Sequence, residues 1–201
     1  SNTIFDINII NKYKVNEWLF DGTPDSTIDN RYYWTGKINY AKDRNGKENS
    51  AIRCNNASII NKLNQNYDLY NDFTISIWFS LTNKSFNAYG RLYDCLQWNS
   101  KTGYHIVCNR DSHSIVFGYF GEDNVTHDVM TNAKLRANQW YNVIVTFKDG
   151  ISCLYLNGKL QQMNTSTHSI NLSKRYISIG NGFDDNRNQP FYGDLDDILI
   201  F

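Results

Sequence analysis

Residues 73–81 read Phe-Thr-Ile-Ser-Ile-Trp-Phe-Ser-Leu, and this stretch decides the fold class. Large apolar side chains occupy every second position from Phe73 to Leu81, with Thr, Ser and Trp side chains between them. A period of two residues is the period of a β-strand, whose successive side chains point to opposite faces of a sheet. The stretch therefore predicts a strand whose row containing Ile75 and Ile77 is buried in a core.

The same alternation recurs further along the chain. It is repeated over residues 141–147, after which Asp149-Gly150 turns the chain into residues 151–156, and these end at Asn157-Gly158. Both dipeptides tolerate positive φ angles and are typical of tight hairpins. Only residues 57–63 indicate a helical turn. Further strands are expected at 15–20, 50–54, 91–96, 104–108, 114–120, 175–179 and 194–201. Many short strands separated by polar turns indicate an all-β sandwich or barrel.

The length of the chain indicates its domain organisation, and its charge indicates which classes of partner it does not attract. The chain has 201 residues, 41% of them hydrophobic, so we expect one domain over residues 1–201, excised from a longer protein. Lysine plus arginine equals aspartate plus glutamate at 20 each, which leaves no excess charge to attract nucleic acid. No apolar stretch approaches the length of a membrane span, so membrane insertion is not expected either.

The cysteines leave two alternatives open. Cys54, Cys95, Cys108 and Cys153 show no Cys-x-x-Cys spacing, which argues against a zinc ribbon or a thioredoxin-like site. They are either buried free thiols or include a Cys95–Cys108 disulfide, because these two lie on apolar runs on either side of a polar turn.

Five stretches in a fixed order carry a family resemblance. They are Trp-Leu-Phe-Asp-Gly at 18–22 with Asp25-Ser26, residues 73–78, residues 140–150, Leu-Tyr-Leu-Asn-Gly-Lys at 154–159, and Gly-Asp-Leu-Asp-Asp-Ile at 193–198. Together they resemble the laminin-G-like jelly rolls of the concanavalin A-like lectin/glucanase superfamily. The resemblance implies a two-sheet antiparallel jelly-roll sandwich, extracellular or at the cell surface, with rim loops that often hold calcium and engage sugars or proteins. Fold alone does not fix which of these functions applies.

An enzymatic role is not expected. Hydrolases of this superfamily resemble one another in a Glu-x-Asp-x-x-Glu strand, whose glutamates act as acid and nucleophile. The glutamates here are Glu17, Glu48 and Glu122, and none of them starts that motif. The histidines are scattered and there is no Gly-x-Ser-x-Gly elbow, so the residues favour a non-catalytic recognition module.

Carbohydrate is the expected partner of this module. Aromatic faces stack on the apolar faces of sugar rings while Asn, Asp and Arg side chains bind hydroxyl groups. The loop residues that we expect to bind the ligand are Trp98, Tyr104, Asp184, Asp185, Arg187 and Tyr192. The alternatives are that these aromatic rings pack under their own loops, or that the chain is a protein-binding adhesion or spacer domain. A groove lined by one or two exposed rings would favour sugar, and a broad flat apolar patch would favour protein.

The resemblance also implies a structural calcium ion that joins the two ends of the chain. Its ligands would be Asp21, Asp25 and Asp196, with Asp197 as a further candidate, since calcium is bound by several hard oxygen atoms. The alternative is that Asp196 accepts hydrogen bonds from backbone N–H groups and Asp21 orders its turn.

Overall fold

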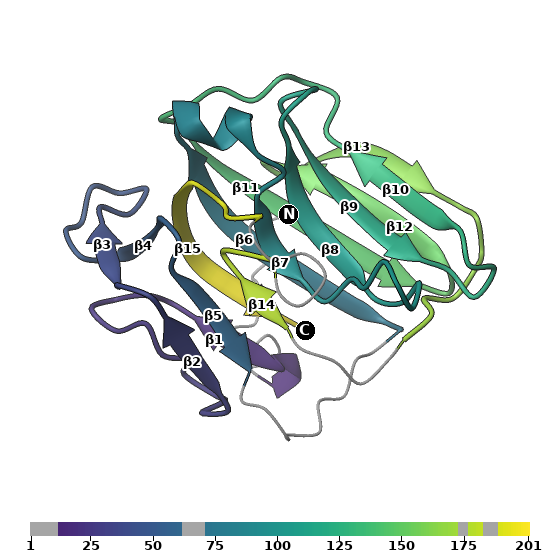
Figure 1. Cartoon of the computed structure of the whole chain (residues 1–201), viewed down its shortest axis with the longest axis horizontal. Helices are drawn as coiled ribbons and strands as arrows, with labels where there is room; N and C mark the ends of the chain where they lie inside the picture. Colours follow the sequence, from purple (N-terminus) through teal and green to yellow (C-terminus); the bar gives the residue numbers. More distant parts are fainter. Residues whose placement is uncertain (1–11, 62–70, 173–176, 183–188) are drawn as a thin grey trace, which may run out of the picture.

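Two antiparallel sheets pack face to face in the computed structural model of the chain (Figure 1), which describes residues 12–61, 71–172, 177–182 and 189–201. The all-β, two-sheet jelly-roll expectation is confirmed. Among the described residues, no helix is long and apolar enough to cross a membrane.

The first sheet is built around the strand that the sequence marks most clearly. Its strands run in the order β13-β12-β11-β6-β15-β4-β3, and β1 pairs with β15. The central strand β6 spans Phe73–Leu81, as predicted, and pairs with β11 on one side and β15 on the other. The remaining bounds are β1 Asn16–Trp18, β3 Asn39–Ala41, β4 Ala51–Cys54, β11 Trp140–Lys148, β12 Ile151–Leu156, β13 Lys159–Asn164 and β15 Gly193–Ile200.

The second sheet carries the candidate site described below. Its strands run in the order β10-β9-β8-β7-β14-β5-β2, and the four strands β7 to β10 follow one another as neighbours. The bounds are β2 Tyr32–Thr35, β5 Ser58–Asn61, β7 Arg91–Asp94, β8 Tyr104–Asn109, β9 Ser114–Phe120, β10 Thr126–Met130 and β14 Ser178–Ile179. A short 3-10 helix, η1, spans Asn83–Asn87 between β6 and β7.

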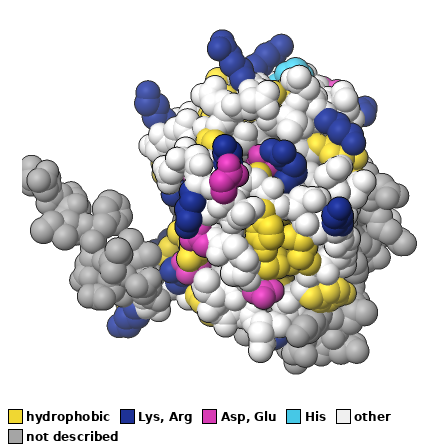
Figure 2. Space-filling model, turned by 90° about the vertical axis from the view of Figure 1, so that its left-hand side faces the viewer, with side chains coloured by type: hydrophobic (Ala, Val, Ile, Leu, Met, Phe, Trp, Pro, Cys, Tyr) yellow, Lys and Arg dark blue, Asp and Glu magenta, His cyan; other side chains and the backbone are white. Residues whose placement is uncertain are grey.

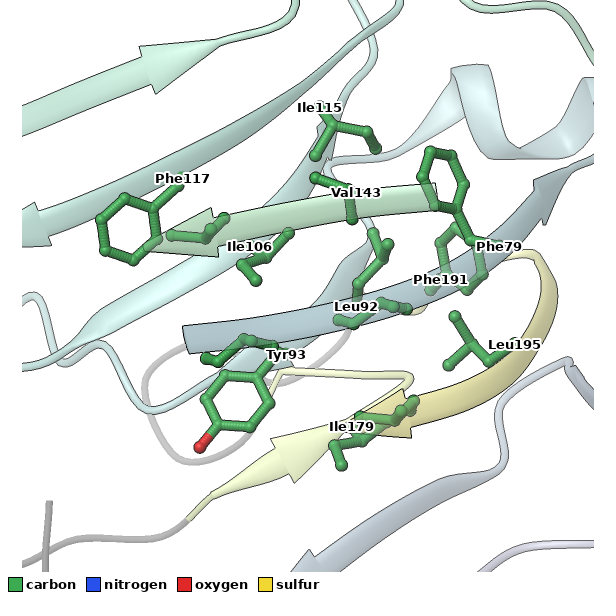
Figure 3. Packing of buried hydrophobic residues seen from close by; sticks show 14 of the residues in the cluster. Phe79, Leu92, Tyr93, Ile106, Ile115, Phe117, Val143, Ile179, Phe191 and Leu195 are labelled. Atoms are coloured by element: carbon green, nitrogen blue, oxygen red, sulfur yellow. The ribbon is translucent and has the colours of Figure 1, made fainter. Parts of the chain in front are cut away.

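The core fills the space between the sheets. Ile75 and Ile77 of β6 are fully buried, as their parity predicts, and Trp78 points away to the outer face, where Arg44 stacks 4.5 Å from its ring. Figure 3 shows Phe79, Val143 and Leu195 of the first sheet packed towards Leu92, Ile106 and Phe117 of the second. Side chains from both sheets therefore share one hydrophobic layer, as in other β-sandwiches.

The turn residues adopt the backbone conformation predicted for them, but several strands have no clear pattern in the sequence. Asp149 and Asn157 adopt positive φ angles of 53° and 48° at the β11–β12 and β12–β13 turns. The helical turn expected at 57–63 is wrong, because Ser58–Asn61 form strand β5 between β2 and β14. Pairing with two neighbours overrides the local propensity of this short segment. Strands β2, β3, β10 and β13 were not predicted either.

The cysteines are free thiols, so the alternative of a Cys95–Cys108 disulfide is wrong. The hairpin on which that idea depends does exist, but the backbone N–H of Cys95 donates to Tyr104, while Cys108 pairs with Ile115 of the next strand. Burial raises the pKa of Cys95, and it raises that of Cys108 to about 12. Both thiols therefore serve as small core side chains rather than as nucleophiles.

Candidate functional site

A groove of about 290 Å³ lies on the outer face of strands β7 to β10. Strand alternation creates it: Tyr104, Ile106 and Cys108 of β8 point into the core, so the side chains between them point outwards. The groove is lined by Tyr89, Arg91, Leu96, Trp98, His105, Val107, Asn109, Val116, Thr126, Asp128 and Gln189.

Gly118 of β9 forms part of the floor of this groove. A Cβ atom at Gly118 would lie 2.4 Å from Asp128 Oδ1, which is too close for any contact, and 3.0 Å from His105 Nε2, which is tight. Because position 118 has no side chain, Asp128 and His105 from the two flanking strands can lean over β9 towards each other. The groove thus gathers polar groups from three adjacent strands.

Two of these polar side chains are buried without full hydrogen bonding. Arg91 is 6% exposed and His105 is 7% exposed, yet Arg91 Nε and His105 Nδ1 have no hydrogen-bond partner among the described residues. The Asp94 Oδ2 atom lies 4.0 Å from Arg91 Nε, beyond hydrogen-bond range. A buried donor or acceptor without a partner costs about 1–3 kcal/mol, and a ligand that supplies the partner recovers that free energy.

The electrostatics of the groove follow from this burial. Burial lowers the pKa of His105 far below its usual value, and the neighbouring Arg91 charge adds to that shift, so the imidazole is neutral at pH 7. Burial also lowers the pKa of Arg91 while Asp94 opposes the change, and a guanidinium remains charged at neutral pH. The groove floor therefore presents one fixed positive charge and one neutral imidazole, and the exposed Asp128 lies beside them.

Trp98 supplies an aromatic wall. Its side chain is 48% exposed, and its ring meets the buried ring of Phe120 edge to face at 5.3 Å between centroids. One side of the indole is thus held by the protein while the remainder is open to a ligand.

A second hollow lies beside β2, on another part of the surface. It measures about 540 Å³ and is lined by Pro24, Asp25, Ser26, Asp29, Asn30, Tyr32, Tyr33, Trp34 and Ile38. Figure 2 views the molecule from the side on which β2 and β3 lie, and shows a patch of hydrophobic side chains with acidic and basic groups around it. The indole N–H of Trp34 donates to the Pro24 carbonyl at 2.7 Å, which fixes that ring within the wall of this hollow.

A family model described as the concanavalin A-like lectin/glucanases superfamily matches residues 54–201. The chain belongs to this superfamily. No curated protein sequence matches it.

Solved structures agree on this concanavalin A-like fold. The binding domain of botulinum neurotoxin serotype D is 16% identical with a TM-score of 0.71, and the same toxin's ligand-binding domain in complex with N-acetylneuraminic acid is 18% identical with a TM-score of 0.71. Each alignment covers 96% of this chain and 48% of the toxin chain. The binding domain of Paraclostridial Mosquitocidal Protein 1 is 19% identical with a TM-score of 0.69, over 92% of this chain and 48% of that one. The chain thus spans about half the length of these structures, and at such identities the likeness concerns the fold.

The three expected ligand-binding residues that the structure describes, Trp98, Tyr104 and Tyr192, lie in different places. Trp98 lines the groove, but Tyr104 is only 4% exposed and stacks on Phe73 in the core, so a ligand cannot reach its ring. Tyr192 lines a separate hollow of about 350 Å³, where the Lys84 ammonium lies 4.1 Å from its ring. Asp184, Asp185 and Arg187 lie outside the described residues.

Three of the four aspartates expected to bind calcium face positive side chains. Asp21 accepts from Lys47 at 3.1 Å, and Arg44 Nη1 donates to Asp196 at 2.9 Å and to Asp197 at 2.7 Å. Asp25 lines the hollow beside β2.

As they stand, these carboxylates do not form a calcium cage. Asp196 also accepts from the backbone N–H of Asp197 at 2.8 Å, and burial together with the Asp197 charge raises the pKa of Asp196 to about 7 against the opposing effect of Arg44. A calcium ion would have to displace Lys47 and Arg44, so the calcium site stays a prediction.

Sequence reasoning missed Arg91, His105 and Asp128 in the groove. A signal for His105 was present, because it occupies the outward parity of a strand whose other row, Tyr104, Ile106 and Cys108, is buried in the core. The convergence of Arg91, His105 and Asp128 depends on the order of strands in the second sheet, which the sequence does not reveal.

Proposed function

We propose that the chain is a non-catalytic recognition module that binds carbohydrate in the groove on strands β7 to β10. The observation that carries this proposal is the pair Arg91 and His105, each more than nine-tenths buried and each with a ring or guanidinium nitrogen that no described group satisfies. Such groups are suited to fixing the orientation of a polar ligand.

The rest of the groove supports a sugar as that ligand. The exposed part of Trp98 offers an apolar face, while Asn109, Asp128 and Gln189 offer polar atoms around it. A groove of about 290 Å³ is near the lower limit of small-molecule sites, which suits a terminal sugar or a short glycan. The fixed charge of Arg91 favours an acidic sugar, because a guanidinium binds a carboxylate in bidentate fashion. One structural neighbour is a toxin domain in complex with N-acetylneuraminic acid, a sugar of this class.

The groove composition argues against hydrolysis. Cleavage of a glycosidic bond requires two carboxyl groups facing the scissile linkage. Among the described residues, Asp128 is the one carboxylic acid that lines the groove. The superfamily and its toxin-domain neighbours are compatible with recognition outside the cell or at a cell surface, which we propose as the location.

A protein partner is the second candidate, and one observation favours it. The hollow beside β2 is lined by the aromatic rings of Tyr32, Tyr33 and Trp34, and Ile28 nearby is 52% exposed. Apolar surface of this kind suits a protein contact in an adhesion or spacer domain better than it suits a sugar ring.

A glycan array with the isolated chain, followed by calorimetric titration of the best glycan, tests the proposal. Arg91→Gln should weaken binding about 10- to 150-fold, the range expected for a lost hydrogen bond to a charged group. Arg53→Gln is the matched control, because Arg53 pairs with Asp194 on the other sheet and should leave affinity unchanged. Absence of any glycan binding would contradict the function, and equal binding by both variants would place the site elsewhere.

A further inference from the structure

A second cluster of chemically reactive side chains lies outside the groove, at Asp123, His127 and His168. Asp123 belongs to the β9–β10 turn, His127 to β10, and His168 to the segment that follows β13. His127 Nε2 lies 2.9 Å from Asp123 Oδ2, and His168 Nε2 lies 3.5 Å from the same oxygen. The ligand atoms of all three residues lie within 4.8 Å of one another.

The backbone around the cluster holds the three side chains in place. Asp123 Oδ1 accepts from the Val125 N–H at 3.2 Å, and the Glu122 N–H donates to the Ser169 carbonyl at 3.0 Å, which joins the turn to the segment carrying His168. The Tyr119 hydroxyl lies 3.3 Å from the His168 carbonyl and donates to it. These bonds involve neighbouring backbone and leave the imidazole groups directed at Asp123.

A glycine makes room for this arrangement. A Cβ atom at Gly121 would lie 2.4 Å from Asp123 Oδ1 and 3.1 Å from His127 Nε2. The ring of His127 also packs against Tyr119 at 5.1 Å and against His168 at 5.4 Å between centroids. The imidazoles are thus packed side by side at the edge of the sandwich, rather than free on the surface.

We propose that Asp123, His127 and His168 bind a divalent transition metal ion, with zinc as the preferred ion. Zinc takes imidazole nitrogen and carboxylate oxygen at about 2.0–2.2 Å with tetrahedral geometry, which separates ligand atoms by roughly 3.4 Å. The separations of 2.9 Å and 3.5 Å from the Asp123 oxygen lie on either side of this value, and the two imidazole nitrogens lie within 4.8 Å of each other, so side-chain shifts bring the three atoms to this geometry. Imidazole also distinguishes the cluster from a calcium or magnesium site, since these ions require oxygen ligands.

Three protein ligands leave the fourth zinc position open. The His168 side chain is 47% exposed and that of Asp123 is 24% exposed, so the fourth position faces solvent and takes water or an oxygen or nitrogen atom of a partner.

The metal ion would also link the two sheets. His127 belongs to the edge strand β10 of one sheet, and His168 follows the edge strand β13 of the other. The two edges already meet where the Met130 N–H donates to Gln162 Oε1 at 2.8 Å. A ligand that binds the folded state alone raises its stability as its concentration rises, so zinc should raise the melting temperature.

Calorimetric titration of the metal-free chain, purified without a polyhistidine tag, tests the site with zinc sulfate as the probe. We expect one zinc ion per chain and a melting temperature that rises with zinc concentration, with no response to magnesium. His168→Gln and Asp123→Asn should each weaken zinc binding at least tenfold, since even the loss of an outer partner of a metal ligand costs about 10–100-fold. Substitution with cobalt should give the visible absorption of a four- or five-coordinate site.

His113→Asn is the matched control. His113 is a partly buried histidine stacked on Phe86, with a positive φ of 53° that asparagine tolerates. The His113→Asn variant should therefore bind zinc no differently from the parent. His168→Gln should keep the metal-free fold intact, because the imidazole is 47% exposed, and the melting temperature of the metal-free variant is the measurement that checks this. Absence of zinc binding, or equal zinc binding by His168→Gln and the parent, would overturn the proposal, as would a loss caused by His113→Asn.

Discussion

Replacement of Trp98 by alanine tests whether this ring contacts the bound sugar. The exposed 48% of this side chain is the part available to a ligand. A tryptophan buries up to about 200 Å², so a ligand covering the exposed half hides about 100 Å² and gains up to about 2.5 kcal/mol. Ordering of the sugar reduces this gain, and a net loss of about 1–2.5 kcal/mol corresponds to binding roughly 5- to 70-fold weaker.

The same substitution should also lower stability, but by no more than a partly buried ring can contribute. The buried half of Trp98, about 100 Å², contributes up to about 2.5 kcal/mol, and the edge-to-face contact with Phe120 adds about 0.5–1.5 kcal/mol beyond that area. The melting temperature of a chain of this size should therefore fall by about 16 °C at most, so binding is measured well below it. Trp78→Ala is the matched control: that ring lies on the outer face of the other sheet and loses a comparable contact, with Arg44. Calorimetry should show weaker glycan binding for Trp98→Ala alone. Unchanged affinity, or equal losses in the two variants, would refute the groove as the binding site.

Three further predictions concern stability. Ile77→Ala should destabilise the fold by about 2–5 kcal/mol in urea denaturation, because Ile77 is fully buried, and a change near zero would contradict the assigned register of β6. His105 has a folded-state pKa well below its unfolded value near 6.5, so the unfolded state takes up a proton first. Stability should therefore fall below pH 6.5 by up to about 1.4 kcal/mol per pH unit. The measurement compares the pH dependence of the unfolding free energy in the parent and in His105→Asn. The raised pKa of Asp196 opposes the trend equally in these two proteins, so a shallower slope in the variant assigns the difference to His105. Identical slopes would show that His105 does not cause the loss of stability. The third prediction concerns the calcium site expected at Asp21, Asp25, Asp196 and Asp197. If calcium binds there, EDTA should lower the melting temperature, and added calcium but not zinc should restore it. Asp196→Asn should abolish both changes in melting temperature. An unchanged melting temperature would show that Lys47 and Arg44 neutralise these carboxylates.

The central strands could be predicted because their sequence pattern and their environment agree. β6, β9 and β12 have the bounds that apolar alternation and Asp-Gly or Asn-Gly turns indicate. The edge strand β13, Lys159–Asn164, carries mostly polar side chains, and its two apolar ones, Leu160 and Met163, are exposed and have opposite parity in the sequence, so it has no apolar row to detect. Short strands such as β3 and β5 are defined by pairing with distant partners, which local pattern cannot show.

The site residues were harder to predict than the fold because they depend on strand order. Trp98 could be singled out as an aromatic residue in a polar turn, whereas the same reasoning selected Tyr104, whose parity places it in the core. Arg91 and His105 come together because β7 and β8 are neighbours, and Asp128 joins them across Gly118. Direct pairing between strands, rather than loop composition, thus assembles the groove.

Glycines of strand β9 and its following turn give a test that distinguishes the two proposed sites. Neither Gly118 nor Gly121 has a positive φ, so alanine is compatible with the backbone at both positions, and only the added methyl group matters. At position 118 the methyl would press on Asp128 and on the buried His105 ring, and at 121 it would press on Asp123 and His127. Gly118→Ala should therefore weaken glycan binding and leave zinc binding intact, while Gly121→Ala should do the reverse. Loss of both ligands in either variant would show that β9 itself had been distorted, and the two sites could then not be treated as independent.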